Sequence, residues 1–282
     1  MEMKSIFTRI ILSGILLGTF FSCETKKADS PNEVTYDSLS VSRIYHMDND
    51  STKPSCTVKV KYIFPVKYSD AGVLSKIQRE LNYAILEDES YEALSPDSAV
   101  EKYASDYIKN YIDEAKVQFP DWAESDETED YFSFYRSIDS KVLYDRNKLL
   151  SYQVSTMDYK GGANSSTLYK NVVLDLKTGN VVTEQDIFIP DYKKVLNAML
   201  TSKIVEQNNV KTAEELLEFG YWGIEDITSN NNFYLDDKGL TYIFNQGEYS
   251  APSLGKIQVP FSFEELSAIL KPDSPISFLF KQ

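Results

Sequence analysis

Short segments with β-strand character, separated by polar turns, constrain the fold of this chain more than any other feature. Residues 58–64 alternate apolar and polar side chains, as in a strand with one buried face, and Pro65 is expected to end that strand. Two glycine-containing turns, at 177–179 and 236–239, are expected to join such segments into hairpins. Further strands are expected at 131–135, 142–144, 149–157, 168–176, 180–183, 232–235, 240–245 and 256–260. Short hairpins pair neighbouring strands antiparallel, so the sheets are expected to be largely antiparallel.

Apolar spacing and capping residues predict helices between these strands. After Asp70 an apolar side chain recurs at every fourth position, at Val73, Ile77, Leu81 and Ile85. Ser95 and Pro96 form a helix start, and further starts are expected at Asp191, Thr212 and Ser262. The predicted fold class is therefore α+β, with largely antiparallel sheets and a few flanking helices.

The helix that begins at Ser95 carries a stripe of one aliphatic and three aromatic side chains. The stripe consists of Val100, Tyr103, Tyr107 and Tyr111. Exposed tyrosines could stack against sugars, but helical spacing favours a buried core face. We expect the stripe to be core.

The N-terminus has the pattern of a bacterial lipoprotein. Residues 1–22 combine a basic start with a short apolar run, which predicts a signal peptide instead of a membrane span. Ser22 and Cys23 directly after that run resemble a lipobox, so we expect cleavage before Cys23 and its acylation, with the lipid bilayer as a partner. The alternative is an ordinary signal peptide with an incidental cysteine. Residues 23–35 are polar and predict a tether. The expected location is extracytoplasmic and membrane-anchored, on the outer membrane if the host is Gram-negative.

The charged and metal-binding residues exclude several function classes. The 282 residues have a formal net charge of −14, which disfavours nucleic acid as a partner. His46 is the one histidine, so neither a histidine metal cluster nor a Ser-His-Asp triad is expected. If Cys23 is acylated, Cys56 has no intramolecular disulfide partner, and we expect it to be a small buried apolar residue. The acid run at 124–130 lacks the glycine and spacing of an EF-hand loop. No metal and no cofactor is predicted.

Two segments are candidates for ligand binding. Residues 159–164 are rich in glycine, with Tyr159, Gly161, Gly162 and Asn164 as the candidate residues, but they lack the ending of a phosphate-binding loop. Those glycines could equally serve a positive φ or a close backbone approach. Tyr221 and Trp222 are expected in a loop, where aromatic side chains could bind a partner or could pack in the core. The sequence nominates no catalytic residue.

Four segments, in order, carry a resemblance to a known family. Residues 159–164, 175–183, 232–245 and 255–266 are similar to successive motifs of the DUF3298 domain, which would occupy 158–282. A DUF4163-type domain usually precedes it and would occupy 36–157. Relatives include the extracellular part of an anti-sigma factor that senses lysozyme and an accessory region of a peptidoglycan deacetylase. Asn164 departs from the family, which commonly has histidine there, so a role that depends on the imidazole does not transfer.

The resemblance implies an extracytoplasmic α+β module without an assigned enzymatic activity. We therefore expect a lipid-anchored, non-enzymatic binding module of the cell envelope, whose ligand is a lysozyme-like protein or peptidoglycan fragments. The net charge of −14 would also attract a basic partner. The alternatives are a hydrolase of envelope glycans that uses an unidentified carboxylate pair, and a purely structural envelope lipoprotein.

Overall fold

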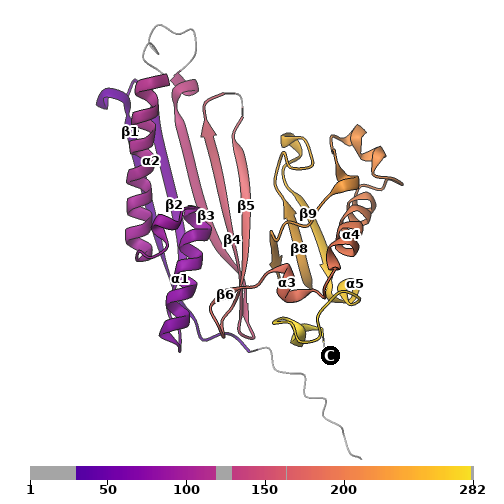
Figure 1. Cartoon of the computed structure of the whole chain (residues 1–282). Coiled ribbons are helices and arrows are strands. Elements are labelled where there is room, and N and C mark those ends of the chain that lie inside the picture. Colours follow the sequence, from indigo (N-terminus) through magenta and orange to yellow (C-terminus); the bar gives the residue numbers. More distant parts are fainter. Residues whose placement is uncertain (1–29, 119–128, 163, 281–282) are drawn as a thin grey trace, which may run out of the picture.

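The chain forms a long six-stranded sheet followed by a small three-stranded sheet (Figure 1). The computed structural model describes residues 30–118, 129–162 and 164–280. The first sheet contains β1 (Thr35–His46), β2 (Ser55–Lys67), β3 (Phe134–Arg146), β4 (Leu149–Lys160), β5 (Ser166–Asp175) and β6 (Asn180–Val181), in that order. The second contains β7 (Phe233–Leu235), β8 (Gly239–Phe244) and β9 (Ile257–Ser262). The helices are α1 (Ala71–Leu86), α2 (Pro96–Gln118), α3 (Glu184–Ile187), α4 (Tyr192–Gln207) and α5 (Phe263–Leu266).

The predicted fold class is confirmed, since helices and largely antiparallel sheets make up the structure. The pairing of β2 with β3 is parallel, whereas the other pairs of neighbouring strands in both sheets are antiparallel. The chain between β2 and β3 crosses one face of the sheet as α1 and α2 before it returns. A parallel pair needs such a crossover, which a hairpin turn cannot supply.

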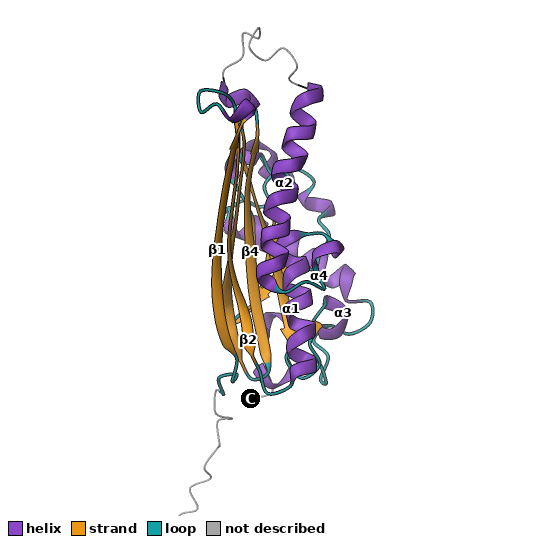
Figure 2. Cartoon of the chain, turned by 90° about the vertical axis from the view of Figure 1, so that its left-hand side faces the viewer, coloured by secondary structure: helices purple, strands orange, loops and turns teal. Residues whose placement is uncertain are grey.

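Helices α1 and α2 cover one face of the first sheet (Figure 2). The Asp70 carboxylate caps α1 by accepting from the backbone N–H groups of Gly72 (2.8 Å) and Val73 (3.0 Å). The hydroxyl of Ser95 accepts from the N–H of Ser98 (3.4 Å) at the start of α2, as the sequence predicts. The predicted apolar stripe of α1 is buried against the sheet: Val73, Ile77, Leu81 and Ile85. Within the described ranges, no helix combines the length and apolar character that crossing a membrane requires.

Burial along the strands follows from what covers each face. In β2 buried residues alternate with exposed or half-buried ones, because the helices cover one face of that strand. In β4 the six residues 149–154 are all buried. There the second half of the chain packs on the other face, where Leu149 and Val173 join the core around α4. Leu150 and Tyr152 belong instead to the core under α1 and α2.

The edge of β5 is covered by side-chain amides from the second half of the chain, which we call the amide ladder. Its members are Asn232, Asn245 and Gln246. Asn232 Oδ1 accepts from the N–H of Asn171 (2.9 Å), while its Nδ2 donates to the carbonyl of Tyr169 (2.9 Å). Asn245 Oδ1 accepts from the N–H of Tyr169 (2.7 Å). The amides thus satisfy edge groups that a further strand would otherwise pair.

The structure corrects several sequence-based expectations about individual elements. Pro65 does not end its strand, because it lies opposite Tyr36 of β1 beside a register shift and β2 continues to Lys67. The segments at 131–135 and 142–144 are not separate strands: residues 131–132 belong to a short 3-10 helix, and β3 runs from Phe134 through the whole of the second segment. Asp191 precedes α4 without a side-chain capping bond. At Thr212 the capping box is not formed as predicted, because the short helix that follows starts at Glu214 after Ala213. The capping box at Ser262 is confirmed.

The predicted domain boundary between 157 and 158 lies inside β4, and the first sheet continues to Val181. If the chain is divided into the part that forms the first sheet and the part that forms the second, the boundary falls after Val181. Residues 30–34, predicted as the end of the tether, lie against the β3–β4 turn, where the N–H of Asn147 donates to the carbonyl of Ser30 (2.8 Å). The predicted signal peptide 1–22, Cys23 and residues 124–128 of the acid run at 124–130 lie outside the described residues.

Replacing Asn232 by alanine should destabilise the whole fold. Asn232→Ala removes four hydrogen bonds of one side chain and leaves the N–H of Asn171 without its partner. We expect the free energy of unfolding to fall by about 2 kcal/mol, measured by urea denaturation. Asn180→Ala, at an exposed position in β6, is the matched control and should change stability by less than about 0.5 kcal/mol. Equal stability of the two variants would contradict a stabilising role of the ladder.

Candidate functional site

The glycine-rich candidate segment forms the turn between β4 and β5. Gly161 and Gly162 both have positive φ, at 81° and 89°. A side chain at Gly161 would also clash with the backbone carbonyl of Tyr131. The hydroxyl of Tyr159 donates to the carbonyl of Gly162 (3.0 Å), and Asn164 is exposed. The two glycines are thus required by the backbone, and a ligand-binding role for this segment stays a prediction.

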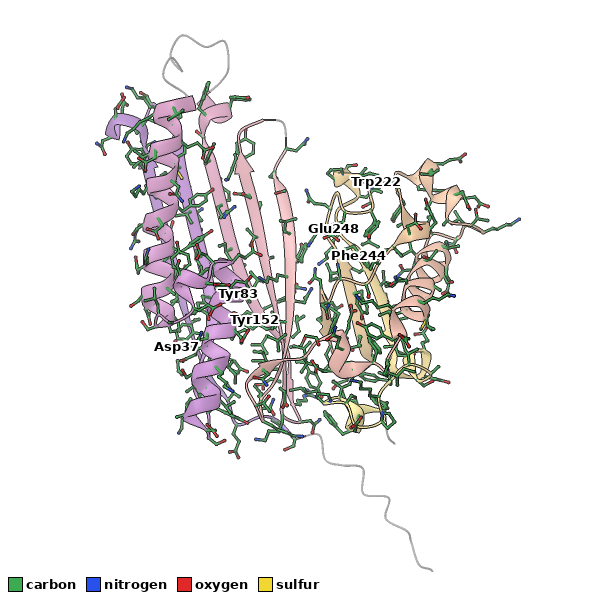
Figure 3. The ribbon with its side chains drawn as sticks, in the orientation of Figure 1. Asp37, Tyr83, Tyr152, Trp222, Phe244 and Glu248 are labelled. Carbon is green, nitrogen blue, oxygen red and sulfur yellow. The ribbon has the colours of Figure 1, made fainter. Side chains whose placement is uncertain are left out.

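The second candidate segment contributes to an exposed apolar surface, which we call the Trp222 patch. It consists of Leu217, Phe219, Trp222 and Leu254, which are between 42% and 62% exposed. The N–H of Trp222 donates to the carbonyl of Tyr249 (3.0 Å), and Tyr221 pairs with Ser250 through a β-bridge. These bonds fix the segment against the chain around Glu248, which lies close to Trp222 in Figure 3. Trp222 is therefore a surface residue whose backbone is held by hydrogen bonds to the segment 249–250.

The structure does not bring the two candidate segments together. The β4–β5 turn is at one end of the long sheet, whereas Trp222 belongs to the separate unit that contains the small sheet (Figures 1 and 3). Among the described residues, no hydrogen bond or ring contact joins one segment to the other. They therefore do not form one site.

A cavity that sequence reasoning missed lies between α2 and the covered face of β3 and β4. It has a volume of about 310 Å³, and we call it the tyrosine cavity. Its walls include Tyr91, Tyr103, Tyr107, Tyr111, Arg136 and Thr156. The predicted stripe of α2 is indeed core for Val100, Tyr103 and Tyr111, which are 8% exposed or less. Spacing alone could not show that the same stripe also borders a cavity, because Arg136 and Thr156 come from strands distant in sequence.

An ion pair organises the tyrosine cavity. The guanidinium of Arg136 binds both oxygens of Asp158, with Nη2 to Oδ2 at 2.6 Å and Nε to Oδ1 at 3.0 Å. Its Nη1 donates to the hydroxyl of Tyr103 (2.9 Å), and its Cζ atom lies 4.9 Å from the ring centre of Tyr107. Tyr103 and Tyr107 are stacked, with ring centres 6.2 Å apart. The bidentate pair with Asp158 and the contact with the Tyr107 ring hold these groups in one arrangement.

The protonation states of Tyr103, Tyr107, Arg136 and Asp106 are fixed at neutral pH. Burial raises the pKa of the Tyr103 and Tyr107 hydroxyls, so both remain protonated. Burial alone would lower the pKa of Arg136, but hydrogen bonds to Asp158 and Tyr103 outweigh that effect and raise it. At the rim, the hydrogen bond from Lys102 (2.6 Å) lowers the pKa of Asp106, which also accepts from the Tyr91 hydroxyl (2.8 Å). The cavity therefore offers fixed charges and hydroxyls beside aromatic faces.

The thiol of Cys56 is next to this region but is buried. It is 0% exposed and packs with Tyr111, Phe132 and Phe134, which confirms the predicted apolar role. Burial raises the pKa of Cys56 to about 12, so the thiolate is rare at neutral pH. Within the described part of the chain, no group of three or more His, Cys, Asp or Glu side chains is placed to hold a metal ion.

Comparison with known proteins defines the class first. A search of curated protein sequences gives no match. A crystal structure of a DUF3298 family member from Bacteroides fragilis NCTC 9343 is similar with a TM-score of 0.83 and 25% identity, covering 90% of this chain and 100% of that chain. A DUF3298 family protein from Pseudomonas aeruginosa PAO1 shares the fold, with a TM-score of 0.57, 14% identity and coverage of 87% and 97%. The architecture is thus that of solved DUF3298 family proteins.

Family models then assign the two parts of the chain. Residues 185–264 match the model described as a protein of unknown function, DUF3298, and residues 51–167 match the model described as deacetylase PdaC. The chain therefore contains a DUF3298 domain preceded by a PdaC-type domain. The segment 159–164, which contributed to the predicted DUF3298 resemblance, falls within the PdaC match. The expected DUF4163 label for the first domain stays a prediction.

Cys56 should resist alkylation in the native protein. In a chain that starts at Glu24, Cys56 is the one remaining thiol, and a pKa of about 12 leaves a thiolate fraction of about 10⁻⁴ at about pH 8. We expect no labelling by iodoacetamide in buffer and complete labelling in denaturing urea, followed by intact mass. Labelling of the native protein at the rate of a free thiol would contradict the burial of this residue.

Proposed function

We propose that this protein is a lipid-anchored, non-enzymatic binding module of the cell envelope, and that its tyrosine cavity binds a peptidoglycan-type glycan. The observation that carries the proposal is a preformed cavity with tyrosine rings, a fixed guanidinium and hydroxyl groups on its walls. The anchor would be Cys23, which lies outside the described residues.

The composition of the cavity suits a sugar. The C–H face of a pyranose can pack on an aromatic ring, while its hydroxyl and acetamido groups need polar partners. Arg136 uses three of its five N–H donors on Asp158 and Tyr103, so two remain for a ligand. Since packing already fixes the rings of Tyr103 and Tyr107, binding costs little additional side-chain entropy. The volume of about 310 Å³ lies at the lower end of the range for small-molecule sites.

Two carboxylates at the tyrosine cavity, Asp106 and Asp158, bear on the choice between binding and hydrolysis. A glycoside hydrolase needs one carboxylic acid that stays protonated near neutral pH, beside a second, ionised carboxylate. The pKa of Asp106 is instead lowered by its hydrogen bond from Lys102, so Asp106 is ionised and cannot serve as that acid. Asp158 is held by Arg136 on both oxygens. Neither carboxylate has the environment of a general acid.

The position of the first described residues supports presentation of the site away from a membrane. Ser30 lies at the β3–β4 turn, at the opposite end of the long sheet from the β4–β5 turn (Figure 1). Phe134 and Lys160, which line the tyrosine cavity, pair with each other close to the β4–β5 end. A lipid at Cys23 would therefore be attached through the end of the sheet opposite to Phe134 and Lys160 of the cavity wall.

The Trp222 patch favours a second candidate function, the capture of a basic protein such as a lysozyme. Exposed apolar residues with an aromatic centre and a polar rim are typical of protein interfaces. Exposed carboxylates flank the patch in sequence: Glu214, Glu215, Glu218, Glu225, Asp226 and Glu248. Exposed carboxylates at these positions would attract a positively charged surface.

Replacing Tyr107 by leucine should weaken glycan binding. Tyr107→Leu removes the ring under Arg136 and the stacking with Tyr103 while it keeps an apolar side chain. We expect the dissociation constant for soluble peptidoglycan fragments to rise about tenfold in isothermal titration calorimetry. Tyr135→Leu is the matched control, since its ring lies on the other face of β3 beside Lys59, and it should bind like the unchanged protein. Equal binding by both variants, or release of reducing ends from peptidoglycan by the pure protein, would contradict the proposed function.

Replacing Trp222 by alanine tests the second candidate. If the patch binds a C-type lysozyme, Trp222→Ala should raise the dissociation constant at least tenfold in biolayer interferometry. The binding of the unchanged protein should survive about 0.5 M salt and spare another protein of similar basic charge. Ile44→Ala, which removes a side chain that is 62% exposed on β1, is the matched control. Binding that salt abolishes, or that Ile44→Ala weakens equally, would indicate nonspecific attraction.

A further inference from the structure

A second cavity lies at the edge of β5, between the two parts of the chain. It has a volume of about 280 Å³, and we call it the amide cavity. Leu168, Tyr169 and Lys170 of β5 form one side, and the asparagines at 230–232 and 245 form the other. Its walls thus come from β4, β5 and the end of α1 and from the asparagines that flank β7 and β8, whereas the tyrosine cavity belongs to the first sheet and its helices.

The two cavities adjoin each other. Glu87 and Thr156 are part of the walls of both. Thr156 points to the same face of β4 as Val154 and Asp158, which belong to the amide cavity and to the ion pair of the tyrosine cavity respectively. The cavities therefore lie side by side across β4 and β5, with Thr156 on the floor where they meet.

Glu87 stands at the junction in an uncommon backbone conformation. It is the C-cap of α1 with φ 57° and ψ 28°, a left-handed position at which glycine is the usual residue. Its carboxylate lies 3.6 Å from Lys170 Nζ and is 64% exposed. Lys170 Nζ in turn lies 4.5 Å from the ring centre of Tyr83, which Figure 3 labels. An exposed pair of this kind is weak, so ligand hydroxyls can replace either partner.

The far wall of the amide cavity is rigid. The buried carboxylate of Glu184 accepts from the N–H of Asn231 (2.9 Å) and from the hydroxyls of Tyr192 (2.9 Å) and Ser229 (2.8 Å). The side chain of Asn232 is held by its four bonds to the β5 edge and to Ile243. A wall fixed in this way is already in place before a ligand arrives. With the asparagines committed to the protein, Leu168 and Lys170 are the side chains most available to a ligand.

We propose that the two cavities form one continuous groove that binds an extended glycan over several sugar units, with the amide cavity as a second subsite. This inference rests on the proposed glycan-binding function of the tyrosine cavity. One sugar would pack on the tyrosine rings. The oligosaccharide would then run over Thr156, between Glu87 and the sheet, and a later sugar unit would contact Leu168 and Lys170. The affinity therefore depends on the length of the oligosaccharide.

The test compares a short and a long chito-oligosaccharide on the chain from Glu24. The double variant Leu168→Ala, Lys170→Ala removes two side chains that line the amide cavity and not the tyrosine cavity, and both are at least partly exposed, so the fold should persist. For the hexasaccharide we expect the dissociation constant to rise about tenfold, and for the disaccharide to change less than about twofold. Lys61→Ala, which breaks an exposed lysine–carboxylate pair of the same length with Asp139 (3.6 Å) away from both cavities, is the control and should change neither value.

The outcomes separate the groove from the function on which it rests. If the unchanged protein binds both oligosaccharides equally well and the double variant alters neither, the groove is overturned while binding in the tyrosine cavity stands. If Tyr107→Leu weakens both oligosaccharides and the double variant weakens the hexasaccharide alone, the groove is supported. If neither oligosaccharide binds the unchanged protein, both proposals fail.

Discussion

Side-chain amides on the free edge of β5 are the interaction on which the arrangement of this protein depends. A strand that ends a sheet leaves N–H and carbonyl groups that need partners, and a further strand is the usual solution. Here β6 pairs with the last two residues of β5, and the edge before it is bonded by Asn232, Asn245 and Gln246. Amide side chains carry both a donor and an acceptor, so each can act as a short piece of backbone.

This ladder explains how the remaining contacts are placed. Because Asn232 and Asn245 flank the hairpin of β7 and β8, their bonds to β5 position the small sheet beside the large one. Leu149 and Val173 are then buried by the second half of the chain, and the N–H of Leu235 reaches the hydroxyl of Ser151 (3.1 Å). The same placement brings the asparagines at 230–232 to one side of the amide cavity. The domain junction and the proposed second subsite thus have one physical origin.

The sequence predicted the local structure well where short-range physics decides it. Asp70 and Ser262 begin helices as their side chains suggest, and the spacing of Val73, Ile77, Leu81 and Ile85 correctly identified a buried face. The prediction that Pro65 ends its strand was wrong, because a proline can remain in a strand beside a register shift. Two sets of hydrogen bonds between residues distant in sequence could not be predicted: those that the Glu184 carboxylate accepts, and those of the amide ladder. Asparagines at 230–232 suggest a loop, and nothing local shows which strand edge they will bond.

The tyrosine stripe of α2 shows why the candidate site was harder to predict than the fold. Spacing predicts which face of the helix turns inward, and Tyr111 follows that rule with its hydroxyl bonded to the carbonyl of Phe132 (3.0 Å). Tyr107, however, meets Arg136 and Asp158, which are paired across β3 and β4. A charge pair placed against a helix stripe prevents apolar packing from closing over it, because buried ions need their polar partners. The cavity beside Tyr107 is therefore a consequence of putting Arg136 and Asp158 where an aliphatic core would otherwise have closed.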